Sequence, residues 1–262
     1  MENALLSDVA EAIQEIARME ILPRFQALSE HQIDQKTSAT DLVTEADLLA
    51  EKRLTALLLD LLPESVVVGE EACHDNPQLM DAIGISSVVW VVDPLDGTAN
   101  FVHGRPFFAT AVALVRDGKT EAGWLYDPMN DHMFCGYKGG SVTRNGVPVT
   151  LYPSDRPLSE KAGAPGPVLP HVLEGRIGEY VHHRSAAHDY MALLSGRLDF
   201  ATFRRILPWD HAAGVLLYSE IGGVTGLLDG RTYDPSLSKG FLIAASDAAL
   251  WAEIATAYRS VD

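Results

Sequence analysis

Two short apolar runs that end in carboxylates constrain the fold of this chain more than any other feature. Residues 88–92 are all apolar and are followed directly by Asp93. Residues 66–68 are valines, followed after one glycine by Glu70 and Glu71. Such runs are typical of buried strands, so a carboxylate that follows one lies at the edge of a sheet, where a cleft can form. The chain is therefore expected to contain a sheet with an acidic cleft at its edge.

The first of these acidic ends has the spacing of a cation site. Asp93 and Asp96 lie three positions apart across a turn that contains Pro94. If both side chains face one point, their repulsion raises a pKa or opens the turn. A hard divalent cation removes that conflict, and ligands that are all oxygen favour Mg²⁺, Mn²⁺ or Ca²⁺ over zinc. The amides of Gly97 and Thr98 can then point at an anion, as those of a helix N-terminus do. The alternative is that this segment forms only a turn.

Two further aspartates stand where helices are expected to begin. Thr44 and Asp47 have the spacing of a capping box ahead of an apolar helix. Asp210 also precedes a helical pattern, at a position where aspartate is a favoured N-cap. From the residues alone, helix capping is the better explanation for both aspartates.

Several familiar metal-binding and catalytic motifs do not fit the sequence. Counted from Asp93, an EF-hand loop needs an oxygen ligand at Leu95 and a glycine at Thr98, and neither is present. A phosphatase of the haloacid dehalogenase type needs Asp-x-Asp-Gly-Thr, and Pro94 stands where its nucleophile should be. The nine histidines form no H-E-x-x-H, and no serine or cysteine elbow accompanies them. A covalent triad is therefore not supported.

The charge balance and the cysteines exclude several partners. The chain has 36 acidic and 20 basic residues, a formal net charge of −16. Such a field repels nucleic acid and anionic membranes, so phosphate recognition is expected to be local, through backbone amides or metal ions. Cys73 and Cys135 lack zinc-ligand spacing, which favours a reduced, cytoplasmic setting. No signal peptide is expected, and no segment approaches the roughly 20 apolar residues that span a bilayer.

The order of predicted elements indicates an α+β architecture with two sub-domains, 1–151 and 152–262. Helices are expected at 5–22, 46–62, 185–196, 210–221 and after residue 246. Strands are expected at 66–68, 88–92 and 198–203. Turn signals between 107 and 151 predict an antiparallel meander with a hairpin at Asn145-Gly146. Residues 152–170 are rich in Pro, Gly and Ser and are expected to form a linker or exposed loop.

Two long motifs resemble the signatures of the inositol monophosphatase family. Residues 90–104, WVVDPLDGTANFVHG, resemble the first signature. Residues 209–223, which begin WDHAAG and end EIGG, resemble the second, and shorter matches follow the family's usual order over nearly the whole chain. The resemblance implies a layered α/β/α/β/α sandwich of the sugar-phosphatase type, with one signature in each sub-domain. It also implies a Mg²⁺-dependent, lithium-sensitive phosphoric monoester hydrolase that is usually a homodimer.

The resemblance implies a site for two or three Mg²⁺ ions. Glu70, Asp93 and the carbonyl oxygen of Leu95 are the expected ligands of the first ion. Asp93, Asp96 and Asp210 are the expected ligands of the second, and a weaker third ion is expected near Glu70, which also takes part in catalysis. Asp210 would then keep its place at a helix start and point into the cleft.

The resemblance also assigns roles to residues that do not hold the ions. The backbone amides of Gly97 and Thr98 are expected to bind the phosphate. Asp47 and Thr98 are expected to form a dyad that helps to activate the attacking water for an in-line displacement. Glu71 and Lys36 are expected to stand behind the metal ligands and support them.

One position departs from the family and bears on the substrate. Family members that act on inositol phosphates commonly carry a glutamate seven residues before the aspartate of the second signature, where it can bond sugar hydroxyls. This chain has Phe203 there, followed by Arg204 and Arg205. A phenylalanine cannot accept such a bond, and this loss alters discrimination strongly. We hypothesise that myo-inositol phosphate is not the best substrate. Arg184, Arg204 or Arg205 is a candidate to contact a second anionic group, the alternative for each being an exposed surface position.

Three functions are open to a chain with these motifs. The leading one is hydrolysis of a small phosphomonoester, a sugar or polyol phosphate similar to inositol 1-phosphate. The first alternative is a bisphosphatase that acts on fructose 1,6-bisphosphate or a phosphoadenosine nucleotide. The second is a regulatory role in transcription or RNA processing, which some bacterial relatives have, although the negative charge opposes direct contact with RNA.

Overall fold

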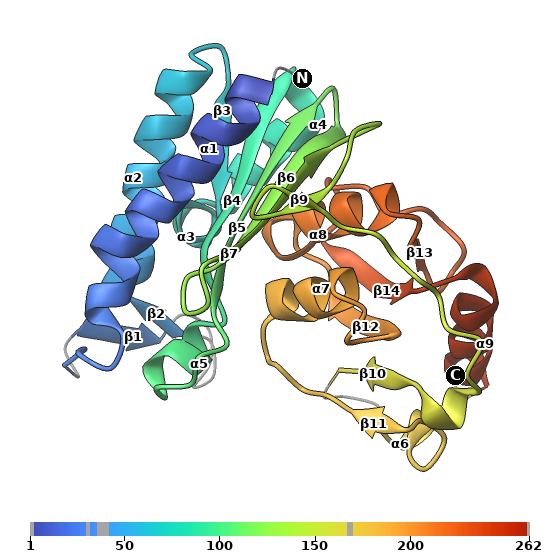
Figure 1. Ribbon diagram of the computed structural model, residues 1–262. Coiled ribbons are helices and arrows are strands. Elements are labelled where there is room, and N and C mark those ends of the chain that lie inside the picture. Colours follow the sequence, from blue (N-terminus) through green and yellow to red (C-terminus); the bar gives the residue numbers. More distant parts are fainter. Residues whose placement is uncertain (1–2, 30–31, 36–41, 167–169, 261–262) are drawn as a thin grey trace.

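The computed structural model describes residues 3–29, 32–35, 42–166 and 170–260 (Figure 1). Its strands form two large sheets and one small sheet. In the small sheet, β1 (Ile33–Gln35) pairs antiparallel with β2 (Leu42–Thr44), and Leu42 lines the cavity described below.

The first large sheet is built from residues 66 to 148, with its strands in chain order. These strands are β3 (Val66–Gly69), β4 (Val88–Asp96), β5 (Ala109–Arg116), β6 (Lys119–Asp127), β7 (His132–Tyr137), β8 (Thr143–Arg144) and β9 (Val147–Pro148). β3 and β4 are parallel, and every later neighbouring pair is antiparallel, which confirms the predicted meander. Asn145 and Gly146 join β8 to β9 with φ values of 49° and 78°, as a two-residue type I′ hairpin requires.

The second large sheet has the strand order β11-β10-β12-β14-β13. These strands are β10 (Ala162–Ala164), β11 (Glu179–Tyr180), β12 (Phe200–Arg205), β13 (Val224–Leu227) and β14 (Lys239–Ala245). The predicted loop at 152–170 is therefore wrong in part, because it contains β10. The small residues of β10 carry no apolar pattern. A Cβ on Gly163 would lie 2.1 Å from Phe200 Cζ. Residue 163 must therefore lack a side chain if that ring is to fit against the strand.

Helices cover and separate the two large sheets, which gives five layers (Figure 1). The longer helices are α1 (Asn3–Ile16), α2 (Glu45–Leu61), α7 (Ala186–Leu194), α8 (Pro208–Glu220) and α9 (Ala248–Arg259). α1 and α2 pack on one face of the first sheet, α7 and α8 lie between the sheets, and α9 packs on the outer face of the second. The chain thus has the expected layered α/β/α/β/α fold.

The two-sided burial of β4 explains its unbroken apolar run. Trp90 and Val92 pack into the core under α1 and α2, whereas Val89 and Val91 pack into the core under α7 and α8. All four side chains are at most 1% exposed. Because successive residues of a strand point to opposite faces, a strand covered on both faces is apolar throughout.

The first helix ends earlier than predicted, and the short elements complete the chain. α1 stops at Ile16 and passes into a π-helical segment, Ala17–Ile21, and then into a 3₁₀ turn that contains Pro23. The other short helical elements are α3 (Glu70–Asp75), a 3₁₀ turn (Pro77–Asp81), α4 (Ala82–Ile85), α5 (Thr98–Val102), a 3₁₀ turn (Leu158–Glu160) and α6 (Pro170–Leu173). Within the described ranges, none of the helices combines the length and apolarity needed to cross a membrane.

The chain passes from the first large sheet to the second between Pro148 and Ala162. We propose that the predicted sub-domain boundary at residue 151 marks this passage. α8 crosses the division, because it belongs to the second half of the chain and packs against β5 and β6 of the first sheet.

Candidate active site

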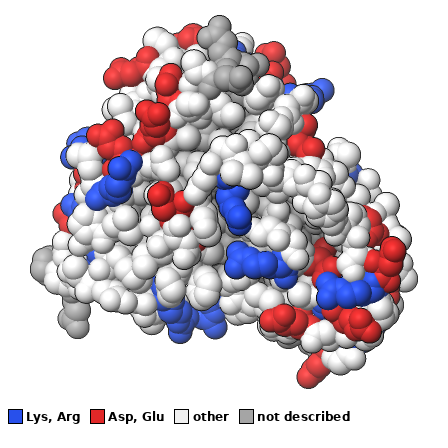
Figure 2. Space-filling view, viewed as in Figure 1, with Lys and Arg blue, Asp and Glu red and all other residues white. Residues whose placement is uncertain are grey.

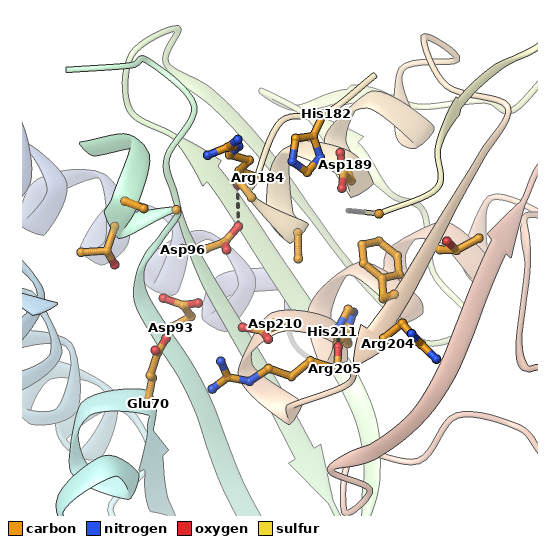
Figure 3. A pocket seen from close by; sticks show the side chains of 18 of the residues that line it. Glu70, Asp93, Asp96, His182, Arg184, Asp189, Arg204, Arg205, Asp210 and His211 are labelled. Atoms are coloured by element: carbon orange, nitrogen blue, oxygen red, sulfur yellow. Dashed lines mark hydrogen bonds between the residues drawn. The ribbon is translucent and has the colours of Figure 1, made fainter. Parts of the chain in front are cut away.

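A cavity of 420 Å³ lies where the ends of β4 and β12 meet the first turns of α3, α5, α7 and α8 (Figure 3). Most residues singled out from the sequence line it. They are Glu70, Asp93, Leu95, Asp96, Gly97, Thr98, Arg184, Phe203, Arg204, Arg205 and Asp210. Asp47 and Glu71 are buried beside the cavity without lining it. Lys36 lies outside the described residues.

Three carboxylates from three separate stretches form an acidic group in this cavity. Glu70, Asp93 and Asp210 each place one oxygen within 4.8 Å of the other two. Burial first, and then the neighbouring acidic charges, raise the pKa of Asp93 well above its usual range. A bound cation relieves that conflict, and a set of oxygen ligands alone suits Mg²⁺. The residues of the acidic group therefore fit the expected metal.

Asp210 is not the N-cap residue that composition alone suggests. α8 begins at Pro208, and Leu207 occupies the N-cap position. Proline is favourable at the first helical position, where its missing N–H has no partner to lose. Asp210 lies in the first turn and faces the cavity in Figure 3.

An irregularity at the end of β4 brings Asp93 and Asp96 to the same cavity. Residues three apart on a regular strand point to opposite faces. The pairing of β4 with β5 shifts register between Asp93 and Asp96, where Pro94 has no N–H to donate. Hydrogen bonds hold the shifted segment: Thr110 Oγ1 donates to the Pro94 carbonyl at 2.9 Å, and the Leu95 N–H donates to Asp93 Oδ1 at 3.0 Å. Both aspartates consequently line the cavity.

Gly97 allows the chain to turn from β4 into α5. Its φ is 89°, and a Cβ there would lie 2.6 Å from the carbonyl oxygen of Phe107. Only glycine meets both conditions without strain. The turn places Gly97 and Thr98 on the cavity wall next to the acidic side chains.

The Asp47 carboxylate serves two elements at once. Oδ2 accepts hydrogen bonds from the Thr44 N–H at 2.8 Å and from Thr44 Oγ1 at 2.5 Å, so the predicted capping box of α2 is present. Oδ1 accepts a hydrogen bond from Thr98 Oγ1 at 2.9 Å. Burial raises the pKa of Asp47 to about 6, although the bonds from Thr44 and Thr98 act in the opposite direction.

Asp96 is bound to the start of α7. Its Oδ2 accepts from Ser185 Oγ at 2.5 Å and from the Ala187 N–H at 2.7 Å. Burial raises the pKa of Asp96, and these two bonds oppose the rise. Ser185 was not predicted as a site residue. Its position at the start of a predicted helix signalled an N-cap, which it is, since it accepts from the His188 N–H at 3.2 Å.

Glu51, which was also not predicted as a site residue, positions Glu70. The two oxygens of Glu51 accept from the N–H groups of Glu71 and Ala72, each at 2.8 Å. These N–H groups lie in the first turn of α3 and have no partner within the helix. Glu51 thus replaces a capping side chain that Gly69, the N-cap residue, cannot supply. Glu70, the first residue of α3, is held in place by this bond pair.

The wall opposite the acidic group combines arginines with an aromatic stack. Phe203 stacks on Tyr190, with ring centres 5.2 Å apart, and meets the edge of His211 at 4.7 Å. Burial lowers the pKa of His211 to about 4. In Figure 3 the Arg205 side chain extends toward the acidic group, whereas Arg204 extends away from it. This wall is therefore aromatic and basic, whereas the facing side of the cavity carries the acidic group.

Acidic side chains are spread widely over the face seen in Figure 2, with basic side chains among them, several near its centre. The acidic group contains three of the 36 acidic residues, so most of the net charge of −16 lies outside it.

Comparison with known proteins agrees with the geometry. The model of the inositol monophosphatase family matches residues 2–261. The chain is 32% identical to the "Nus factor SuhB" of Vibrio cholerae, over 82% of this chain and 81% of that protein. It is 28% identical to the "Fructose-1,6-bisphosphatase/inositol-1-monophosphatase" of Thermotoga maritima, over 81% of each. A solved IMPase structure from Thermotoga maritima has a TM-score of 0.81 at 25% identity, covering 98% of this chain and 95% of the other. The chain therefore belongs to the inositol monophosphatase family and is a phosphoric monoester hydrolase.

Proposed function

We propose that this protein hydrolyses a small phosphomonoester, a sugar or polyol phosphate of the inositol 1-phosphate type, with Mg²⁺ as its cofactor. The observation that carries this proposal is the acidic group, whose oxygens lie within 4.8 Å of one another beside the hydrogen bond from Thr98 to Asp47. Carboxylates so close together repel one another and are stabilised by a bound cation, and the neighbouring hydroxyl–carboxylate pair supplies a proton acceptor next to that position.

The expected ligands are distributed over two ion positions. Glu70, Asp93 and the Leu95 carbonyl would hold the first ion, with room for a weaker third near Glu70. Asp93, Asp96 and Asp210 would hold the second. When bound, Mg²⁺ offsets the carboxylate charges, lowers the pKa of a water molecule and stabilises the entering and leaving oxygens of the phosphoryl group.

The protein's own groups position the phosphate and accept a proton. The amides of Gly97 and Thr98 would hold phosphate oxygens at the start of α5. Thr98 Oγ1 donates its proton to Asp47 Oδ1, so the Thr98 oxygen can accept a hydrogen bond from the attacking water. Asp47 is fixed for this task by its second oxygen, which is bound to Thr44. The water is thereby oriented for attack in line with the leaving oxygen.

The test measures phosphate release from a broad panel of phosphomonoesters, with and without Mg²⁺. Asp93→Asn and Asp210→Asn are expected to lower Mg²⁺-dependent release more than about 100-fold, because even residues behind metal ligands cost 10–100-fold. The matched control is Asp229→Asn, which changes an aspartate outside the cavity that forms an ion pair with Arg231 and has Arg259 nearby. Unchanged release in both cavity variants would show that the acidic group is not the metal site.

The residues that line the cavity beyond the acidic group bear on the choice of substrate. Phe203 lines the cavity where a carboxylate would bond sugar hydroxyls, so we expect myo-inositol 1-phosphate to be a poor member of the panel. Arg184, Arg204 and Arg205 line the same cavity, which supports a bisphosphate as the first alternative. The highest kcat/KM on inositol 1-phosphate would contradict this expectation.

A regulatory role in transcription or RNA processing is the alternative of a different class, suggested by the name of the Vibrio relative. Asp96→Asn separates the two, since phosphate release should collapse while a regulatory role persists.

We further propose a cytoplasmic location, which the free thiols of Cys73 and Cys135 support, and a homodimeric state, which equilibrium sedimentation would test.

A further inference from the structure

Ser185 links the Asp96 carboxylate to the imidazole ring of His188. The Ser185 hydroxyl oxygen lies 2.5 Å from Asp96 Oδ2 and 3.0 Å from His188 Nδ1. Asp96 ends β4, whereas Ser185 is the N-cap of α7 and His188 lies in its first turn. Ser185 and His188 are only 4% and 5% exposed, so solvent does not compete for these bonds.

Hydrogen-bond accounting fixes the direction of each bond. An ionised carboxylate only accepts, so the Ser185 proton is donated to Asp96. The Ser185 oxygen can then only accept from the ring, which places a proton on His188 Nδ1. The chain of donation therefore runs from His188 to Ser185 and from Ser185 to Asp96.

Asp127 anchors the other side of the ring. His188 Nε2 lies 3.6 Å from Asp127 Oδ2 and is buried without a closer hydrogen-bond partner among the described residues. Asp127 itself accepts from the N–H groups of Met129 and Asn130 and from the Asn130 side-chain amide. Burial raises the pKa of Asp127, but the His188 ring and these amides outweigh it and keep the pKa below its usual value. The Asp127 carboxylate is therefore held next to Nε2, whereas Ser185 lies next to Nδ1.

The packing around the ring restricts it to this orientation. The Phe107 and His188 rings are nearly perpendicular, at 87° with centres 5.6 Å apart, and the centre of the His183 ring lies 6.2 Å from that of His188. His183 is itself held by Asp189, whose Oδ1 lies 2.6 Å from His183 Nδ1. The rings of Phe107 and His183 thus lie against His188, while Asp127 and Ser185 lie next to its two nitrogens.

We propose that His188 is a positioning residue for Asp96. Anchored by Asp127, it orients the Ser185 hydroxyl so that Asp96 Oδ2 stays bound at the start of α7 and Oδ1 stays available for a cation. The Ala187 N–H, 2.7 Å from Oδ2, completes this arrangement. The inference rests on the proposed function, because that function makes Asp96 a ligand of Mg²⁺.

The test is a double-mutant cycle in the full chain, read out as Mg²⁺ affinity by titration calorimetry. His188→Leu keeps the bulk of the side chain and removes its bond to the Ser185 hydroxyl, and we expect it to weaken Mg²⁺ binding about tenfold, the upper end of the cost of one lost hydrogen bond. In a Ser185→Ala background the same change should cost nothing more, because the link it acts through is gone. His188→Asn keeps an amide donor near the position of Nδ1 and should bind Mg²⁺ within about threefold of the parent.

Equal losses from His188→Leu in both backgrounds would overturn the proposal, since packing alone would then explain the effect. A second measurement does not depend on how the leucine variant folds. In metal-free parent protein labelled with ¹⁵N-histidine, NMR should show a protonated Nδ1 on His188, assigned by the absence of its signal from His188→Asn. An Nδ1 without a proton would refute the donation to Ser185.

The outcomes separate this inference from the proposed function. A parent protein that binds no Mg²⁺ would refute the proposed function and, with it, the role of Asp96 as a ligand. If the parent binds Mg²⁺ but His188→Leu binds it equally tightly, only the positioning role of His188 is refuted.

Discussion

The Thr98 hydroxyl donates a 2.9 Å hydrogen bond to Asp47 Oδ1, although 51 residues separate them in the chain. The other oxygen of Asp47 caps α2 through Thr44, so the start of that helix sets the position of the carboxylate. Helix capping and the proposed acceptance of a proton therefore use different oxygens of one side chain.

The two roles of Asp47 can be separated by substitution. Asp47→Asn is expected to lower kcat about 100-fold, the low end of general-base contributions. Thr44→Ala removes hydroxyl bonds of the capping box but leaves Thr98 bound to Oδ1, so it should lower the free energy of unfolding by about 1 kcal/mol with a much smaller change in kcat. Steady-state kinetics and urea unfolding of both variants check this, and equal losses of kcat would contradict it.

At Thr98 the hydroxyl, rather than the size of the side chain, should decide activity. Thr98→Ser keeps the donor to Asp47, and we expect kcat within about threefold of the parent. Thr98→Val keeps the shape and removes the donor, and kcat should fall about 100-fold. Because the Thr98 hydroxyl also lies 3.0 Å from the Leu95 carbonyl, an expected Mg²⁺ ligand, Mg²⁺ affinity is measured for both variants and kcat is compared at saturating Mg²⁺. A valine variant as active as the serine variant would exclude the dyad.

The pKa of Asp47 predicts how the stability of the metal-free protein varies with pH. Burial raises this pKa from 3.8 to about 6. Between the two values the folded chain holds a proton that the unfolded chain has released, so this stabilisation is complete below about pH 3.8 and is lost as the pH rises through about 6. From pH 4 to 7 the parent should lose about 2 kcal/mol relative to Asp47→Asn.

The pKa of His211 also changes on folding, so the pH dependence of the parent alone does not isolate the contribution of Asp47. Its pKa is lowered from 6.5 to about 4, so its contribution has the opposite sign and is lost as the pH falls through about 4. Because parent and Asp47→Asn share His211, the difference between their unfolding free energies isolates Asp47. A difference that stays constant from pH 4 to 7 would contradict the buried position of this carboxylate.

Gly69 should prove necessary for the position of Glu70. A Cβ at residue 69 would lie 2.3 Å from Glu51 Cδ, so Gly69→Ala should displace the carboxylate that caps α3. We expect the Mg²⁺ concentration for half-maximal activity to rise about tenfold. Gly84→Ala is the matched control, because a Cβ there meets no atom within 4 Å. Equal Mg²⁺ dependence in the two variants would show that Glu51 does not position Glu70.

Local features of the fold were predictable because their causes are local. The strand at 88–92 is apolar throughout because both of its faces are buried, and the capping box at Thr44 and Asp47 depends only on residues three apart. β10 was not predictable, because Gly163 is explained by the ring of Phe200, which is distant in sequence. The register shift that turns Asp93 and Asp96 toward one cavity likewise depends on pairing with β5.

The sequence by itself determined the chemical groups of the site and the local frames that present them: carboxylates after buried strands, a capped helix and two family signatures. Only the tertiary structure decided which of these groups meet. Asp96 reaches Ser185 across 89 residues, and Glu70 lies with Asp210 because the layers bring the starts of α3 and α8 together. Propensity and spacing act over a few residues, whereas contacts between distant stretches follow from how sheets and helices pack. For that reason the sequence predicted Asp210 as a helix N-cap and indicated no role for His188.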